Sequence, residues 1–131
     1  MLTRIYLYVI MQVLSKFTLH TRGAIMDIAT KVELSALYEV YGNSLTDNQR
    51  QVIDFCVLQD LSLGEVSDLL NISRQAVKYT LDNATTSMLK LESKLQVLAK
   101  RQNLQQQLIE LQNSTKDIDI KQKISDILEE L

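Results

Sequence analysis

Five neighbouring side chains, Ser73, Arg74, Gln75, Lys78 and Tyr79, are of types that bind duplex DNA. An arginine can pair bidentately with O6 and N7 of guanine, and a glutamine can pair with N6 and N7 of adenine. Ser73 and the first amides of a helix can bind a phosphate, and Lys78 suits a phosphate or a base edge. Each type is also common on protein surfaces. These residues therefore predict a DNA contact if the fold places them at the start of an exposed helix.

The residues before this set predict a helix-turn-helix. Only Asn71 and Ile72 separate a helix that ends at Leu70 from one that Ser73 can cap. So short a link needs a left-handed residue, and asparagine is the best choice after glycine. Ser67 is small where the two helices must lie close together. The side chains expected to share one core are Val66, Leu70, Ile72 and Val77. This spacing fits a helix-turn-helix, with a generic helical hairpin as the alternative.

Helices are expected throughout, because proline is absent and glycine occurs three times, which argues against an all-β or loop-rich fold. Capping boxes mark two helix starts, Thr46 with Gln49 and Ser62 with Glu65. Cys56 falls on an apolar stripe, so it is predicted to be a core residue. The sequence predicts an all-α fold in which a helix-turn-helix domain precedes a long C-terminal helical extension.

An earlier helix is expected to end at Gly42. Its apolar face repeats at helical spacing through Leu34, Leu37, Tyr38 and Tyr41. Gly42 is predicted to end this helix in the left-handed conformation that many helix C-caps adopt.

Charge is distributed unevenly along a chain whose formal net charge is −2. Residues 26–72 carry two basic and eight acidic groups, whereas residues 73–101 carry six basic and two acidic groups. The basic stretch indicates a local anionic partner, although a solvated helix face would give the same pattern. The acidic stretch beside it would repel phosphates, which weighs against DNA binding.

The sequence lacks the residue sets of an enzyme or a metal site. One cysteine and one histidine cannot build a zinc or iron–sulfur site, and no glycine-rich phosphate loop occurs. The acidic pairs Asp117/Asp119 and Glu129/Glu130 are expected on a surface helix without catalytic partners. The chain is predicted to be no enzyme and to have no cofactor, metal or small-molecule substrate. A single cysteine excludes an internal disulfide, which predicts a reduced, cytoplasmic protein.

Residues 1–25 form an extension of doubtful origin. Ile5–Leu14 is almost entirely apolar between Arg4 and Lys16, but it is too short to span a bilayer, and no signal-peptide cleavage pattern follows it. Three interpretations stay open. We favour a start-site artefact, with translation beginning at Met26, over a membrane or interface anchor and over a packed helix.

Three blocks of the chain resemble region 4 of sigma factors and, more closely, the YlxM-like family of helix-turn-helix proteins. They are Leu45-Thr-Asp-Asn-Gln-Arg-Gln51, Asp60-Leu-Ser-Leu-Gly-Glu-Val66 and Asn71-Ile-Ser-Arg-Gln-Ala-Val77. The resemblance covers about residues 34–100 and implies a sigma region 4-like domain. Members of that family are typically encoded beside the signal recognition particle GTPase and its receptor, which implies a regulatory or accessory role in the signal recognition particle pathway.

A long helical tail is predicted after the motif. A heptad seam runs through Leu81, Ala84, Met88, Leu91, Leu95 and Leu98. It slips over residues 102–113, and residues 113–115 are expected to link to a last helix. The apolar face of that helix is Ile120, Ile124, Ile127, Leu128 and Leu131. Because such stripes must be buried, we expect a coiled-coil homodimer, with packing back onto the domain as the alternative.

The predicted organisation is the doubtful extension at residues 1–25, a helix-turn-helix domain at 26–100 and a dimerising helical tail at 101–131. Two functional classes stay open. One is a regulator of transcription that binds duplex DNA. The other is an adaptor that keeps the fold but contacts protein or RNA components of the signal recognition particle. Binding to random duplex DNA across a salt series distinguishes them.

Overall fold

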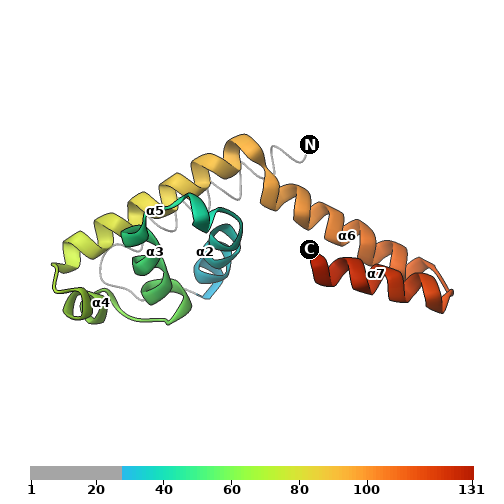
Figure 1. Cartoon of the computed structure of the whole chain (residues 1–131), viewed down its shortest axis with the longest axis horizontal. Helices are drawn as coiled ribbons and strands as arrows, with labels where there is room; N and C mark the ends of the chain where they lie inside the picture. The colour runs from blue at the N-terminus through green and yellow to red at the C-terminus, as the bar shows by residue number, and fades with distance from the viewer. Residues whose placement is uncertain (1–27) are drawn as a thin grey trace. The chain divides into compact units, whose positions relative to one another are not determined.

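The computed structural model describes residues 28–131, and the all-α prediction is confirmed, because every regular element in this range is helical. The elements are α2 (Ile28–Tyr41), the 3₁₀ turn η1 (Gly42–Ser44), α3 (Asp47–Ile53), the π-helical segment η2 (Asp54–Leu58), α4 (Leu63–Leu70), α5 (Arg74–Leu95), α6 (Val97–Ser114) and α7 (Ile118–Glu130) (Figure 1). They form two compact units, one ending at Leu95 and the other spanning Gln96–Leu131. The interpretations of residues 1–25 lie outside the described residues.

Helix α2 packs its apolar face into the first unit, as its spacing predicts. Leu34, Leu37 and Tyr41 are buried, and Tyr38 is partly buried. Helix α2 ends directly before Gly42, as predicted, but the predicted left-handed conformation is wrong, because Gly42 opens the 3₁₀ turn η1 without a left-handed φ. Glycine is needed there for space, since an added Cβ would lie 2.8 Å from Cε2 of the Tyr38 ring.

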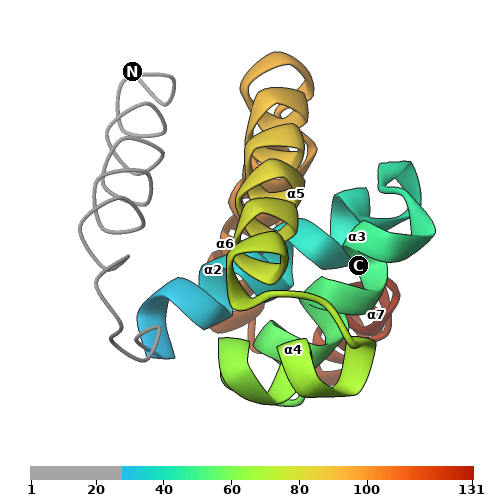
Figure 2. The ribbon, with the colours of Figure 1, turned by 90° about the vertical axis from the view of Figure 1, so that its left-hand side faces the viewer.

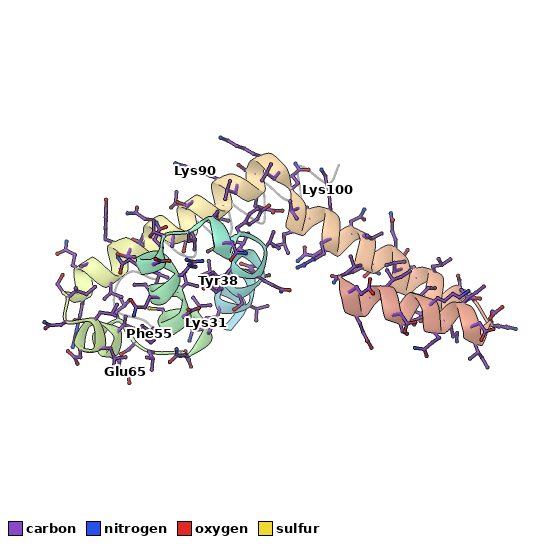
Figure 3. The ribbon with its side chains drawn as sticks, in the orientation of Figure 1. Lys31, Tyr38, Phe55, Glu65, Lys90 and Lys100 are labelled. Carbon is purple, nitrogen blue, oxygen red and sulfur yellow. The ribbon has the colours of Figure 1, made fainter. Side chains whose placement is uncertain are left out.

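Helix α3 begins at the first predicted capping box. Thr46 Oγ1 accepts a hydrogen bond from the Gln49 amide at 3.3 Å, and Gln49 Oε1 accepts one from the Thr46 amide at 3.0 Å. The helix then widens into η2, where Cys56 is buried in the core as predicted. Helix α2 packs against η2, and Figure 3 shows Lys31 of α2 close to this contact.

Helix α5 is the long helix against which the other helices of the first unit pack (Figure 2). Leu81, Ala84 and Met88 are buried in this core. These residues form the first half of the predicted heptad seam. The seam is therefore not one continuous contact for a second chain, because its first half is covered by the chain's own helices.

Helix α5 ends at Leu95, where the heptad pattern predicts a continuous helix. Gln96 has φ 53° and ψ 35°, a left-handed conformation that separates α5 from α6. This break could not be predicted, because the sequence contains neither glycine nor proline at this point. Residues 100 and 101, the predicted domain boundary, lie within α6.

The second unit is a hairpin of α6 and α7. The two helices contact each other, and Gln112 Nε2 donates a hydrogen bond to Ser125 Oγ at 2.8 Å. Asp117 caps α7 by accepting hydrogen bonds from two amides of its first turn. The link therefore runs over Thr115–Asp117, close to the predicted residues 113–115. Of the side chains in these two helices, only Ile124 is buried.

Candidate nucleic-acid interface

The candidate interface starts at the second predicted capping box, which fixes the first turn of α4. Ser62 Oγ accepts a hydrogen bond from the Glu65 amide at 3.1 Å, and the Glu65 carboxylate accepts one from the Ser62 amide at 2.7 Å. These hydrogen bonds lower the pKa of Glu65 from its usual value of 4.5. Glu65 extends from the outer side of α4 (Figure 3), so it places a negative charge beside the interface.

The turn between α4 and α5 contains the predicted left-handed asparagine. Asn71 has φ 53° and ψ 46°, and its amide donates to the carbonyl of Ser67. The Ile72 amide donates to the same carbonyl at 3.1 Å, while Ser67 Oγ donates to the Ile72 carbonyl at 2.6 Å. Ser67 therefore closes the turn with its backbone and its side chain, whereas the sequence predicted a role only for its small size.

One predicted core residue next to the turn is exposed. Val66 and Val77 are fully buried as predicted and Leu70 is partly buried, but Ile72 is 36% exposed and does not belong to the core. Both backbone groups of Ile72 are bound to Ser67, and this turn directs the Ile72 side chain to the surface. Leu69 of α4 is 62% exposed as well, so the surface beside the turn includes apolar side chains.

The start of α5 carries three of the predicted DNA-binding residues. Ser73 caps the helix, because its Oγ accepts a hydrogen bond from the Ala76 amide at 3.0 Å. Ser73, Arg74 and Gln75 are all exposed. The structure thus brings these side chains together on the first turn of α5, where amides of a helix lack partners within the helix.

Arg74 has a neighbour that the sequence did not predict. A Cβ added at Gly64 in α4 would lie 3.1 Å from Nη2 of Arg74 and 3.2 Å from its Cζ. The guanidinium therefore lies across the bare backbone of Gly64. A side chain at this position would push the guanidinium aside, so Gly64 helps to set where Arg74 rests.

Lys78 is engaged within α5. Its Nζ lies 2.9 Å from Oδ2 of Asp82, and its side chain is 33% exposed. The other carboxylate oxygen of Asp82 is buried without a hydrogen-bond partner. Opposite charges four residues apart on a helix were the sequence signal for this pair, which the prediction of a DNA contact did not use. Lys78 must leave Asp82 before it can bind a phosphate.

Tyr79, the one aromatic residue of the candidate set, is 68% exposed. It follows Gln75 by four residues, so the two side chains lie on the same side of α5. Val77, which is fully buried, lies on a different side of the helix. Tyr79 therefore extends the exposed surface of the first turn along α5.

The basic stretch predicted at residues 73–101 is not a single patch. Arg74 and Lys78 lie near the turn, whereas Lys90 lies three turns further along α5 (Figure 3). Lys100 belongs to the second unit. Within α5, Arg74 and Lys78 are therefore the basic residues that lie at the candidate interface.

Residues 28–131 give little support for a reactive thiol, a metal site or a membrane-spanning helix. Burial raises the pKa of the Cys56 thiol to about 11, which makes it a poor nucleophile. Among residues 28–131, no three His, Cys, Asp or Glu side chains are grouped so that they could hold a metal ion. The helices of the same range are also too short or too polar to cross a membrane.

Comparison with known proteins gives consistent matches. Residues 28–128 match the UPF0122 family, described as "Putative helix-turn-helix protein, YlxM / p13 like". A UPF0122 protein of Thermoanaerobacter sp. (strain X514) is 37% identical over 95 residues, which cover 72% of this chain and 81% of the relative. A probable UPF0122 protein of Mycoplasma mycoides is 39% identical over 100 residues, which cover 75% of this chain and 85% of the relative.

Proposed function

The chain belongs to the UPF0122 family of helix-turn-helix proteins, and from this premise we propose that it is a regulatory protein that binds duplex DNA through α5. The observation that carries the proposal is the turn at Asn71, which leaves Ser73, Arg74 and Gln75 exposed together at the start of α5. No catalytic activity, cofactor or small-molecule substrate is part of this proposal. We place the protein in the cytoplasm, where a reduced cysteine is stable.

The first turn of α5 enters the major groove in this proposal. Arg74 pairs with O6 and N7 of a guanine, and Gln75 pairs with N6 and N7 of an adenine. Ser73 and the first amides of α5 contact a backbone phosphate, and α4 crosses the backbone above the groove. Tyr79 faces the groove wall one turn further along the helix.

Two side chains of the candidate interface, Arg74 and Lys78, must move to bind DNA. Arg74 leaves the backbone of Gly64, and Lys78 exchanges the Asp82 carboxylate for a phosphate. The exchange at Lys78 gains little net energy, because it replaces one ion pair with another. Arg74 gains a bidentate contact without losing an ion pair, so it should contribute more to affinity than Lys78.

The test is a titration of fluorescently labelled duplex DNA at two salt concentrations. Arg74→Ala should weaken binding by about 1–3 kcal/mol and relax the preference at one base pair. Lys78→Ala should weaken binding on all sequences alike and lower the salt slope by about one unit.

Lys90→Ala is the matched control, because it removes the same charge from an exposed position of α5 far from the turn. If Arg74→Ala and Lys90→Ala weaken binding equally and leave sequence preference unchanged, the protein responds only to total charge. That result, or the absence of DNA binding by the folded wild-type protein at low salt, would refute the proposal.

A second candidate function is supported by the surface beside the turn. Leu69 and Ile72 are exposed there, and Glu65 and Asp68 are exposed acidic residues of α4. Apolar and acidic groups suit a protein partner better than a phosphate backbone. The second candidate is an adaptor that contacts components of the signal recognition particle. It is favoured if duplex DNA does not bind and Leu69→Glu abolishes binding to the purified particle.

A further inference from the structure

The second unit is too small to bury a core by itself. Its helices have 18 and 13 residues, and Ile124 is their one buried side chain. Segments below about 40 residues usually need a disulfide, a metal or oligomerisation to fold stably. The unit contains no cysteine, and no metal-binding group occurs among residues 28–131. The hairpin therefore needs a cover for its apolar side chains.

Six large apolar side chains of the hairpin are about half exposed, and four of them form two pairs. In α6 they are Leu104 at 43% and Leu111 at 54%, and in α7 they are Ile120 at 44% and Ile127 at 46%. The members of each pair are seven residues apart, so each pair lies along one side of its helix. We call these four side chains the hairpin face.

Both pairs lie on the same face of the hairpin. Gln112 of α6 hydrogen-bonds to the carbonyl of Lys121 in α7 at 3.2 Å, so both residues lie near the contact between the helices. Leu111 precedes Gln112 by one residue and Ile120 precedes Lys121 by one residue, a rotation of about 100° in each case. Because the helices of a hairpin run in opposite directions, the same rotation brings Leu111 and Ile120 to one face.

We propose that a second copy of this chain covers the hairpin face and forms a four-helix bundle. The charges at one end of the hairpin support a second copy as the partner. Lys100 lies near the start of α6 and Glu130 ends α7, and both are exposed. A two-fold axis parallel to the hairpin places each α6 against α7 of the other copy. Lys100 of each copy then lies opposite Glu130 of the other.

The two hairpins could also be related by a two-fold axis perpendicular to their helices. Such an axis would place the end with Lys100 against the loop end of the second copy. The parallel axis pairs opposite charges at the rim and the hairpin face at the centre, which is the usual anatomy of an interface. The dimer forms through α6 and α7, so it does not depend on whether α5 binds DNA.

The first test uses sedimentation velocity of the full chain at 10–100 µM, a concentration range of the order at which a modest interface associates. The wild-type protein should be a dimer. Leu104→Glu should raise the dissociation constant roughly 100-fold or more, because a symmetric interface buries the new charge twice. Ile109→Glu is the matched control, since Ile109 is 41% exposed in the same helix but lies about 140° around it from Leu104.

The second test reverses the rim charges, which are both exposed. Lys100→Glu and Glu130→Lys should each weaken the dimer roughly 5-fold, and the double variant should restore it. A monomeric wild-type protein at 100 µM overturns the proposal. If Leu104→Glu then also lowers the melting temperature of that monomer, the face packs within its own chain. Equal dissociation by Ile109→Glu and Leu104→Glu overturns it as well.

Discussion

Helices α5 and α6 carry apolar residues at the same spacing but differ in what covers them. In α5, Leu81 and Met88 are seven residues apart and are 4% and 0% exposed. In α6, Leu104 and Leu111 have the same separation and are 43% and 54% exposed. Three other helices of the first unit pack on α5, whereas the second unit supplies only α7. A heptad pattern therefore predicts a helix with an apolar side, and the number of neighbouring helices decides whether the chain itself covers it.

The largest expected effect tests this difference directly. Leu81→Ala should lower the free energy of unfolding by about 2–5 kcal/mol, because it leaves a cavity in the core of the first unit. Leu104→Ala should lower it by less than about 1 kcal/mol when the protein is dilute and monomeric, because half of the side chain is already in water. Urea denaturation at low micromolar concentration, followed by circular dichroism, measures both.

Equal losses in these two variants would contradict the comparison. They would mean that Leu104 is covered within the monomer, and that α6 belongs to a core as α5 does. Repeating the denaturation of Leu104→Ala at 100 µM adds a control, because the loss should grow with concentration if the hairpin face forms a dimer.

Local rules explain why the start of the candidate site could be predicted from the sequence. The Ser62 and Thr46 capping boxes form between residues three apart, so no distant contact is needed to specify them. Asn71 is likewise selected by its own backbone conformation, which few other residues adopt. These local signals correctly located the link between α4 and α5 and the start of α5.

Contacts between distant residues explain what could not be predicted. Gly42 is required by the Tyr38 ring and Gly64 leaves room for the Arg74 guanidinium, and a sequence shows only that glycine is present. The exposure of Ile72 follows from hydrogen bonds at the turn. Gln96 breaks α5 although glutamine is a good helix former, so its residue type argues for the opposite of what is observed.

Two junctions between helices contain a residue in the left-handed conformation. Asn71 joins α4 to α5, and Gln96 joins α5 to α6, with φ 53° in both. Asn71→Ala should destabilise the first unit by about 1 kcal/mol, because alanine disfavours this conformation, whereas Asn71→Gly should cost less.

Gln96→Gly should favour the observed break between α5 and α6, without lowering the stability of the first unit. Thermal melting followed by circular dichroism measures these variants. A loss of stability in Gln96→Gly equal to that in Asn71→Ala would show that a continuous helix through residue 96 is part of the native fold.

The smallest expected effect concerns the two capping boxes, which differ in one charge. The third helical residue is neutral Gln49 in α3 and charged Glu65 in α4. Because hydrogen bonds from Ser62 lower the pKa of Glu65 below 4.5, this carboxylate stabilises the fold above the pKa of the unfolded chain. That stabilisation is lost as the pH falls through the lower pKa of the folded state.

Glu65→Gln should remove this contribution, so the difference in stability between the wild-type protein and the variant should be present at pH 7 and should shrink below pH 4.5. Gln49→Glu should introduce the same acid sensitivity at α3, where Thr46 offers an equivalent amide. Urea denaturation of the three proteins between pH 3 and pH 7 measures both effects. Parallel pH profiles for all three proteins would mean that the charge of Glu65 adds nothing to the cap, and that the two boxes work by hydrogen bonding alone.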